Sequence, residues 1–426
     1  MGAFSRANSA TRSKSVKAAL SGITLLGVSA LVLSGCASSG DTEAGSSETL
    51  DLKIGTILPQ TGTLAVLGPP EFAGVDLAVK EINDAKAGIE ISVDHKDSGD
   101  TTTDLATQSA TALIADGVSA IIGAASSGVS KTFIDQVTQA GVVQISPANT
   151  SPDFTDYADD GYYFRTAPSD VLQGRILGNK IVTDGKTDVA ILYMNDAYGT
   201  GLYDNLKISL EDGGASVVGE EIFEPASTDF TSAIQALLAT NPDALVVISF
   251  DEIKTIAEQL AGQGFDFSKL YGVDGNYGVI GEADTNVDIA GAQFTNPGVL
   301  ATEDFQAKLQ ELVAEQGEDE LTVFSYAAES YDATTLTALA ALQGGATDGA
   351  TIKDNLQSVS EGGTVCESFA DCAKLIADGE DIDYNGVSGP IEWDDNGDET
   401  EAFVSIFQYS AGNVTEGIDQ VAGTLE

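Results

Sequence analysis

Histidine, cysteine and basic side chains are scarce in this sequence. The chain has 426 residues, with one His, three Cys, and 19 Lys and Arg against 66 Asp and Glu. It contains no H-E-x-x-H, no Walker A motif, no Cys/His cluster, and no G-x-S-x-G ahead of a helix. A nucleophile activated by His95, the single His, lacks support in the sequence. We therefore expect no enzyme, metal or cofactor, although so many acids leave a glycosidase with paired carboxylates open.

The shortage of basic residues also excludes classes of partner. The formal net charge is −47. Binding of nucleic acid rests on Lys and Arg meeting phosphate, and adhesion to an anionic membrane rests on the same charges. The acids are dispersed along the chain rather than gathered in blocks. This indicates a soluble, acidic surface that suits salt and no nucleic-acid partner.

The N-terminus has the layout of a secretory signal. Residues 1–17 carry four basic residues and no acid, and residues 19–33 are apolar but interrupted by Ser and Gly. The stretch Leu33-Ser34-Gly35-Cys36 resembles a bacterial lipobox, in which the Cys is lipidated and becomes the new N-terminus. An ordinary signal with a chance Cys is the alternative. We expect a lipoprotein signal over residues 1–36, lipidation of Cys36, and a flexible linker over residues 37–50, rich in small and polar residues.

The two other cysteines are close together, in TVCESFADCAK. An extracytoplasmic compartment favours a local disulfide between Cys366 and Cys372. A metal pair is the alternative, but further ligands are missing from the neighbouring sequence.

Strand-like and helix-like segments alternate from Leu50 onward. Eight apolar runs predict strands: LKIGTIL, IEISVDH, VSAIIGAA, GVVQIS, DVAILYMN, ASVVGEEIF, DALVVISF and KLYGVDG. Amphipathic segments lie between them, and such alternation is typical of βαβ units and parallel sheets. The chain is too long for one compact core, and the strands fall into two sets. The stretch DYNGVSGPIEWDDNGDETEAFVSIFQYSAGNV predicts turns and hairpin strands.

Polar residues follow several of these strands. Ligands bind at the carboxyl ends of strands in open parallel sheets. Ser127 and Thr150 could hold a small carboxylate there. Asp170 and Asp274 could hold an ammonium, and Tyr198 offers an aromatic ring and a hydroxyl. Each residue alone has a structural alternative: Ser127 and Asp170 could cap helices, and the other three could stand in turns.

The order of several stretches resembles a known family. These stretches are LKIGTILPQTGTLAVLG, EFAGVDLAVKEIND, IIGAASSGVS, ISPANTSPDFT, FRTAPSDVLQG, LYMNDAYGTG, AAESYDA and YNGVSGPIEWDDNGD. Together they resemble the leucine/isoleucine/valine-binding proteins, the type I substrate-binding proteins of ABC importers. The resemblance implies an α/β fold of two doubly wound parallel-sheet lobes joined by a three-stranded hinge. Lobe 1 is expected over 51–168 and 298–398, and lobe 2 over 169–297 and 399–426.

The same resemblance assigns the first half of a ligand site. It implies that Ser127, Ala148 and Thr150 meet the carboxylate and amine of a ligand through hydroxyls and backbone. Asn149 would contribute its backbone.

The second half would come from the hinge and lobe 2. Asp170, Tyr198 and Asp274 match positions that close over the ligand, and Asp274 would pair with an ammonium. Leu67 departs from the family, where an aromatic residue often stands, and this changes the pocket for the ligand side chain.

The function that follows is capture of a small ligand outside the cytoplasm. We expect a monomeric, lipid-anchored solute-binding protein of the cell envelope that takes an amino acid or related amine and delivers it to the permease subunits of an ABC importer. A sensor that reports the ligand to a membrane receptor shares the fold and is the first alternative. An extracytoplasmic hydrolase is the second.

The lipobox predicts that Cys36→Ala releases the protein from the membrane. Two acyl chains hold a protein stably on a bilayer, and this variant has none. Cell fractionation should find wild type with the membranes and Cys36→Ala in the medium or the soluble fraction. A Cys36→Ala protein that stays on the membrane without lipid would show that Cys36 is not the anchor.

Overall fold

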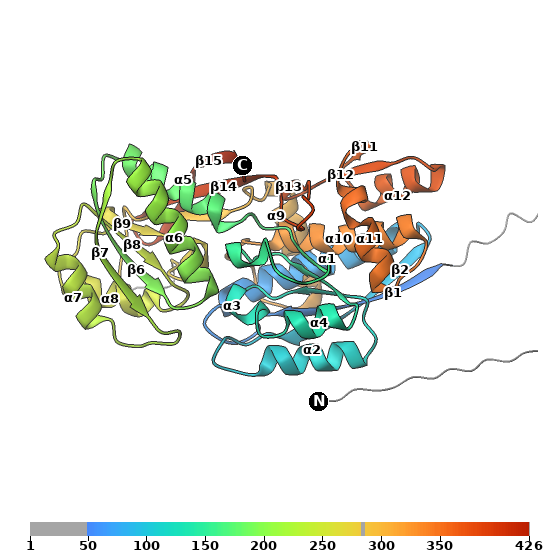
Figure 1. Cartoon of the computed structure of the whole chain (residues 1–426), viewed down its shortest axis with the longest axis horizontal. Helices are drawn as coiled ribbons and strands as arrows, with labels where there is room; N and C mark the ends of the chain where they lie inside the picture. The colour runs from blue at the N-terminus through green and yellow to red at the C-terminus, as the bar shows by residue number, and fades with distance from the viewer. Residues whose placement is uncertain (1–48, 283–285, 426) are drawn as a thin grey trace, which may run out of the picture. The chain divides into compact units, whose positions relative to one another are not determined.

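The structure of the chain is a computed structural model that describes residues 49–282 and 286–425 (Figure 1). The predicted signal, Cys36 and the predicted linker up to residue 48 lie outside the described residues. Leu50 already belongs to the first strand.

The first lobe is built on a five-stranded parallel sheet with the order β2-β1-β3-β4-β5. Its inner strands β1 and β3 are mostly apolar and buried because helices cover both faces, whereas the edge strand β2 alternates between buried and exposed residues at its start. The elements of this part are β1 (Leu50–Leu58), α1 (Gly68–Ala85), β2 (Ile89–Asp97), α2 (Leu105–Ala115), β3 (Ala120–Gly123), α3 (Ser127–Ser130), α4 (Ile134–Gln139), β4 (Val143–Ser146) and β5 (Tyr163–Arg165), with short helical turns η1 (Ala65–Leu67) and η2 (Pro152–Phe154).

The second lobe holds a seven-stranded sheet with the order β15-β14-β10-β9-β8-β6-β7. Strands β6 to β10 are parallel, and β14 and β15 add an antiparallel hairpin at one edge. The elements are α5 (Asp170–Thr183), β6 (Asp188–Met194), α6 (Ala197–Asp212), β7 (Ser216–Phe223), α7 (Thr231–Ala239), β8 (Ala244–Ile248), α8 (Ile253–Gly262), η3 (Phe267–Lys269), β9 (Leu270–Gly272), η4 (Asp274–Asn276), β10 (Gln293–Pro297), β14 (Glu401–Ser410) and β15 (Val414–Thr424).

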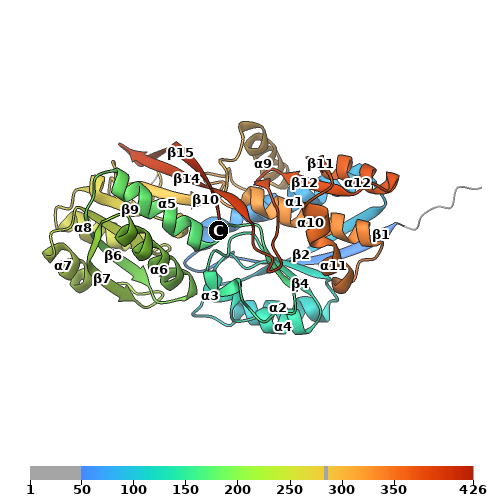
Figure 2. The same cartoon turned by 45° about the horizontal axis from the view of Figure 1, so that its top comes forward.

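The chain returns to lobe 1 between β10 and β14. It adds α9 (Glu303–Gln316), α10 (Ala327–Gly344), α11 (Gly349–Ser360), β11 (Thr364–Cys366), α12 (Phe369–Asp378), β12 (Ile382–Gly386) and β13 (Gly389–Pro390). Helix α10 is buried over most of its length, including its polar residues Glu329 and Asp332. It lies beside α1 in both views (Figures 1 and 2). A side chain at Gly74 of α1 would meet the Ala327 carbonyl at 2.1 Å, so the two backbones approach closely there.

The predicted fold class is confirmed. Each of the eight predicted strand segments contains a strand, and the hairpin strands after residue 382 are present as well. The amphipathic pattern of SKTFIDQVTQA, residues 130–140, favours one helix, but apart from Ser130, the last residue of α3, only Ile134–Gln139 of it is helical, as α4, because the chain turns after α3 ends. The lobe limits at 168/169, 297/298 and 398/399 remain predictions, and each falls in a segment that connects the two sheets. We call these connections 166–169, 298–302 and 399–400.

Cys366 and Cys372 form a disulfide. It joins β11 to α12 within lobe 1, so the local pairing expected from the sequence is confirmed.

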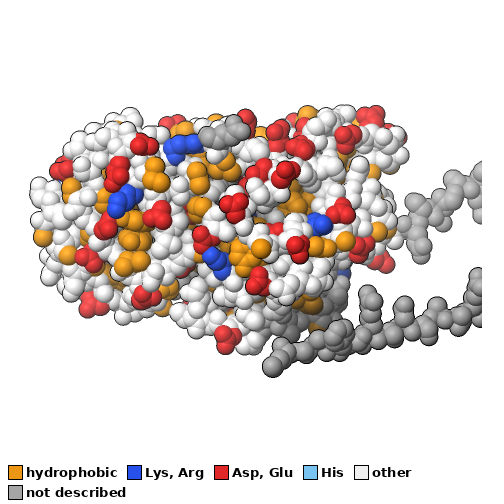
Figure 3. All heavy atoms as spheres, viewed as in Figure 1, with side chains coloured by type: hydrophobic (Ala, Val, Ile, Leu, Met, Phe, Trp, Pro, Cys, Tyr) orange, Lys and Arg blue, Asp and Glu red, His pale blue; other side chains and the backbone are white. Residues whose placement is uncertain are grey.

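The surface is acidic, as the composition predicts. Asp and Glu side chains are scattered over the face in Figure 3, with few Lys and Arg among them. Within the described residues, no helix has both the length and the apolar character that crossing a bilayer requires.

A buried ion pair joins the end of β5 to the segment that leads into β14. Arg165 Nε lies 2.6 Å from Asp398 Oδ1, and its Nη2 lies 2.7 Å from Oδ2, with both side chains almost wholly buried. A buried pair is costly to break because the remaining charge is left without a partner.

We predict that Asp398→Asn lowers the free energy of unfolding by about 3–5 kcal/mol, since the shape is kept and the charge is lost. Urea denaturation measures the loss. Asp395→Asn, three residues away and exposed, is the matched control and should stay within about 0.5 kcal/mol of wild type. Equal stabilities of the two variants would contradict the role given to the ion pair.

Candidate functional site

A small cavity lies between the two lobes, at the carboxyl ends of strands from both sheets. Its volume is about 10 Å³, room for about one water molecule. Both sheets contribute because the parallel strands of each lobe end at the edge that faces the other lobe. The lining residues are Leu64, Leu67, Ala125, Ser126, Ser127, Ala148, Tyr198, Phe250, Asp274, Gly275 and Tyr326.

Ser127 lines this cavity and is not the cap of its helix. The capping residue of α3 is Ser126, whose hydroxyl accepts a hydrogen bond from the Val129 N–H. The Ser127 hydroxyl instead accepts from the Ser151 N–H at 3.3 Å. A hydroxyl has a donor and a second lone pair to spare, so Ser127 can still bind a ligand.

Ala148 lines the same wall, and Asn149 supports it from behind. The Asn149 amide donates to the Ala124 and Ala125 carbonyls at 3.0 and 2.8 Å, which ties the loop after β3 to the loop after β4. Its N–H donates to Ser146 Oγ, and its carbonyl accepts from Arg165. Asn149 therefore positions the two loops, and its N–H can meet a ligand only if the bond to Ser146 breaks.

Thr150 and Asp170 lie next to each other behind the cavity wall. The Asp170 N–H donates to the Thr150 carbonyl at 2.7 Å. Ser169, not Asp170, caps α5. The Thr150 hydroxyl and both carboxylate oxygens of Asp170 are fully buried and make no hydrogen bond of ordinary geometry, although the Thr150 hydroxyl is close enough to Asp170 to oppose part of the rise in its pKa. Burial raises the pKa of Asp170 well above its usual range, and the charge of Asp274 raises it further.

Asp274 is the most heavily bonded acid of the cavity. Its Oδ1 accepts from Gln173 Nε2 at 2.9 Å and from the Tyr198 hydroxyl at 2.7 Å. Its Oδ2 accepts from the Tyr326 hydroxyl at 2.7 Å. A carboxylate has about four acceptor positions, so about one remains for a ligand. Burial raises the pKa of Asp274, and the donors that surround it oppose this shift.

The apolar part of the cavity comes from both lobes. The Tyr198 ring stacks on Phe250, with ring centroids 5.5 Å apart. Leu67, at the end of η1, is buried beside Leu64 on the opposite lobe. An aliphatic side chain of a ligand would meet these groups.

Several hydrogen bonds hold the lobes together around the cavity. The Ser151 hydroxyl donates to the Ala197 carbonyl at 2.8 Å, and the Asp251 N–H donates to the Thr63 carbonyl at 3.1 Å. The bond from Tyr326 to Asp274 also crosses from lobe 1 to lobe 2. The structure is thus a closed state, and a ligand enters only after the lobes separate.

Among the described residues that line the cavity, Asp274 is acidic and none is basic, and Asp170 lies behind the wall. Arg165 is the basic side chain that acts on Asp170, and all five of its N–H donors are used by Asp398, Thr155, and the carbonyls of Asn149 and Ser151. In the part of the chain that is described, no three His, Cys, Asp or Glu residues gather as metal ligands would. The site therefore suits a ligand that brings its own positive charge.

His95 takes no part in this site. Its ring nitrogens lie 2.9 Å from Thr56 Oγ1 and 2.9 Å from Asp76 Oδ1. Thr56 is fully buried, so the contact is structural.

Sequence reasoning missed several residues of the site. Phe250 follows β8, and the strand-end rule could have placed it. Gln173, Leu64 and Tyr326 had no local signal. Tyr326 stands just before α10 with a φ of 62°, and its partner Asp274 is 52 residues away in the sequence.

Comparisons with known proteins support the fold and identify the family. A family profile described as periplasmic binding protein matches residues 51–413. A Leu/Ile/Val-binding protein homolog 3 from Brucella melitensis is 28% identical over 200 residues, which are 46% of this chain and 53% of that protein. The chain thus spans about half the length of this curated relative.

Solved structures match over more of the chain. The branched-chain amino acid transporter substrate binding protein LivJ from Streptococcus pneumoniae, in complex with isoleucine, has a TM-score of 0.70 and 26% identity, and the match covers 88% of this chain and 99% of that one. A solute binding protein of an ABC transporter from R. palustris, in complex with benzoate, has a TM-score of 0.68 and 20% identity, with 88% and 97% coverage. The second likeness concerns the fold alone.

The unpaired carboxyl of Asp170 predicts a pH-dependent stability. A carboxyl whose pKa is raised on folding favours the folded state below its unfolded value of about 3.9, and this contribution is lost as the pH rises through the raised value. Asp170→Asn removes this dependence. Without ligand, the variant should melt a few degrees above wild type at about pH 7 and level with it at about pH 4.

Thermal unfolding at several pH values tests this. Asp212→Asn, at the exposed end of α6, should follow wild type throughout. A lower melting temperature for Asp170→Asn at neutral pH would mean that the carboxylate stabilises the ligand-free protein.

Proposed function

Because the chain belongs to the periplasmic binding protein family, we propose that it is an extracytoplasmic solute-binding lipoprotein, anchored through Cys36, that captures an amino acid or related amine between its lobes and delivers it to an ABC importer. The observation that carries this proposal is the buried pair Asp170 and Asp274 at a closed cavity with no free cation. Two acids in such a place need a cation or protons.

The ligand's amine would take the remaining acceptor position of Asp274. An ammonium donates up to three hydrogen bonds, and the Thr150 hydroxyl and Asp170 are unpartnered groups close behind. A bound ammonium stabilises the ionised form of the two buried acids, and a neutral ligand does not.

The ligand's carboxylate would lie against lobe 1. Ser127 offers a hydroxyl there, and Ala148 offers an N–H whose present bond to Ser146 Oγ is long, at 3.3 Å. Arg165 has no donor to spare, so the carboxylate depends on these neutral groups.

A plain carboxylate such as benzoate fits less well. The R. palustris protein of the same fold was solved with benzoate. Here a ligand with only negative charge would add to Asp170 and Asp274 without a cation in the site. A zwitterion brings both charges, as isoleucine does in the complex of the Streptococcus protein.

The energies suffice for useful affinity. A hydrogen bond to a charged group contributes about 1.5–3 kcal/mol, and a micromolar dissociation constant corresponds to about 8 kcal/mol. Some three to five such bonds, reduced by the cost of ordering the ligand and closing the lobes, reach this range.

The alternatives predict other partners or other chemistry. A sensor would use the same closure to contact a membrane receptor, and only the partner differs. A hydrolase needs a base beside an accessible nucleophile, whereas His95 is bonded to buried Thr56 and to Asp76. Members of the family bind substrates rather than transform them, which favours binding alone.

We predict that one class of amine-bearing ligand stabilises the protein and that Asp274→Asn abolishes most of this effect. Native mass spectrometry of the purified protein should first reveal any bound mass. Thermal shift with amino acids, amides, urea and small acids then identifies the class. A ligand at 100 times its dissociation constant stabilises by about 2.7 kcal/mol, and Asp274→Asn should weaken binding roughly 10- to 100-fold.

Asp212→Asn, in the same lobe but exposed, is the matched control and should bind as wild type does. Stabilisation by an amide or a plain acid, unchanged in Asp274→Asn, would leave a binding protein but overturn the assignment of Asp274 to an ammonium.

A further inference from the structure

A second group of buried acids lies where the three connections between the lobes meet the start of α10. The Thr166 hydroxyl of the first connection donates to the Glu329 carbonyl at 2.9 Å. Gly298 of the second connection packs against the Glu329 carboxyl, since a Cβ at Gly298 would lie 2.0 Å from its Oε1. Glu399 of the third connection interacts electrostatically with Glu329. Glu329 of α10 thus contacts the first two connections and interacts electrostatically with the third.

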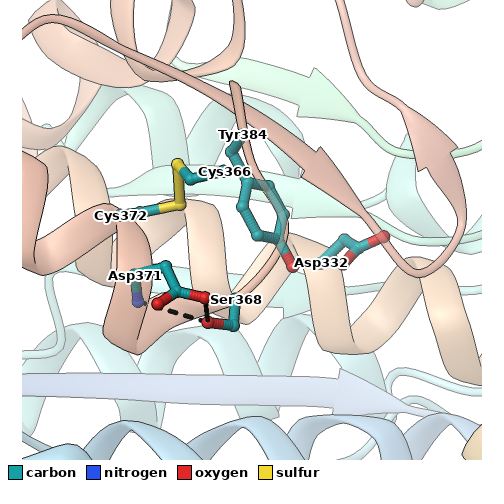
Figure 4. Close-up of a disulfide and its surroundings, with 6 residues drawn as sticks. All are labelled: Asp332, Cys366, Ser368, Asp371, Cys372 and Tyr384. Carbon is teal, nitrogen blue, oxygen red and sulfur yellow. Dashed lines mark hydrogen bonds between the residues drawn. A yellow bond between two sulfur atoms is a disulfide. The ribbon is translucent and has the colours of Figure 1, made fainter. Parts of the chain in front are cut away.

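The group has four members, which we call the hinge acids. They are Glu71 on α1, Glu329 and Asp332 on α10, and Glu399, and none is more than 5% exposed. Asp332 is fully bonded: it accepts from the Tyr384 hydroxyl at 2.6 Å and from Ser388 and the Val387 N–H. Figure 4 shows Tyr384 reaching from β12 toward Asp332, next to the disulfide. Asp332 is therefore a fixed member of the group.

Glu71, unlike Asp332, accepts no hydrogen bond. Both of its carboxylate oxygens are fully buried and have no hydrogen-bond partner. It stands in the first turn of α1, four residues after Leu67 of the ligand cavity. A charge at such a position is unfavourable without a partner, so this carboxyl needs a proton while the surroundings stay dry.

The acids raise one another's pKa values in addition to the effect of burial. Burial raises the pKa of Glu329 to about 8 and that of Asp332 to about 6. Burial and then the charge of Glu329 raise the pKa of Glu71. Burial, followed by the charges of Glu329 and Asp332, raises the pKa of Glu399. Such coupled groups share their protons as a set.

No basic side chain among the neighbours is available to neutralise the group. Arg165 is the cation that acts on Glu399, and its donors are all engaged, chiefly by Asp398. Of the other charged groups on α1, Glu81 bonds with Lys308 and Tyr331, Asp76 bonds with His95 and Gln316, and Lys80 bonds with Asp84.

The same turn of α10 also reaches the ligand cavity. Tyr326, three residues before Glu329, donates the hydrogen bond to Asp274 that spans the lobes. The charge of Glu329 is among the groups that act on Tyr326. A shift of α10 near Glu329 would therefore change the hydrogen bond between Tyr326 and Asp274.

We propose that Glu71, Glu329 and Glu399 form a proton-operated switch in the hinge: protonated, they allow the lobes to close, and as they ionise they drive the lobes open and weaken ligand capture. Opening bends the three connections and brings water to the acids, and water favours the ionised form. The free protein thus closes with uptake of protons. The effect on ligand capture rests on the proposed function, whereas the opening itself does not.

The test is small-angle X-ray scattering of the ligand-free, full-length chain in detergent from about pH 6 to about pH 9, with a bilayer nanodisc sample as a check on the detergent. The radius of gyration of wild type should increase as the pH passes the region of about 8. Glu329→Gln carries a neutral side chain of the same shape and should stay compact at every pH. Glu311→Gln, on the exposed face of α9, should open as wild type does.

Ligand binding gives the second readout. If closing takes up one proton, the dissociation constant of the amine ligand should increase about tenfold per pH unit above this region in wild type, and much less in Glu329→Gln. Circular dichroism checks that the variant folds, and Glu399→Gln provides an independent test if it does not. A radius of gyration that is independent of pH in wild type, or that rises equally in wild type, Glu329→Gln and Glu399→Gln, overturns the inference.

The two proposals fail in different ways. If no amine stabilises the protein but the scattering transition is present and sensitive to Glu329→Gln, the switch stands and the assigned ligand is wrong. If an amine binds through Asp274 but wild type stays closed at every pH, the ligand stands and the switch is wrong.

Discussion

The ion pair between Arg165 and Asp398 is the constraint on which the rest of the structure depends. Arg165 ends β5 just before the first connection, and Asp398 lies just before the third. The same guanidinium donates to the carbonyls of Asn149 and Ser151, so it fixes the loop that places Ala148 in the cavity wall. All five donors are satisfied, which makes a buried charge tolerable. Arg165 therefore serves the structure, and it does not neutralise the acids of the cavity or of the hinge.

The fold was predictable from the sequence because its strands are buried on both faces. Continuous apolar runs such as DALVVISF have no other stable location, and the alternation with helices then dictates parallel sheets. The strand-end rule placed Ser127, Tyr198 and Asp274 at one cavity for the same reason. It could not decide which residue caps a helix: Ser126 and Ser169 cap α3 and α5, one position before the residues considered. Only backbone geometry separates such neighbours.

The contacts that sequence reasoning could not supply come from residues far apart in the chain. Gln173 reaches Asp274 across 101 residues, and Glu329 meets Thr166 across 163. Neither has a local pattern, because a Gln or Glu on an amphipathic helix usually faces solvent. The composition adds to the difficulty: among 66 acids in the chain, the sequence does not distinguish the few that are buried from those at the surface. Figure 3 shows how many of them do lie at the surface.

The two buried groups of acids respond to protons in opposite senses. In the proposed ligand site, Asp274 and Asp170 would bind an ammonium best when they are ionised, so affinity at the cavity would increase with pH until they have lost their protons. In the proposed switch, Glu71, Glu329 and Glu399 favour closure when they hold protons, so closure would weaken as the pH rises. Capture requires both an ionised cavity and a closed hinge, and is therefore strongest over a middle range of pH. Tyr326 immediately precedes α10, and Glu329 lies in the first turn of this helix, so the proposed switch would couple the cavity to the hinge through the start of α10.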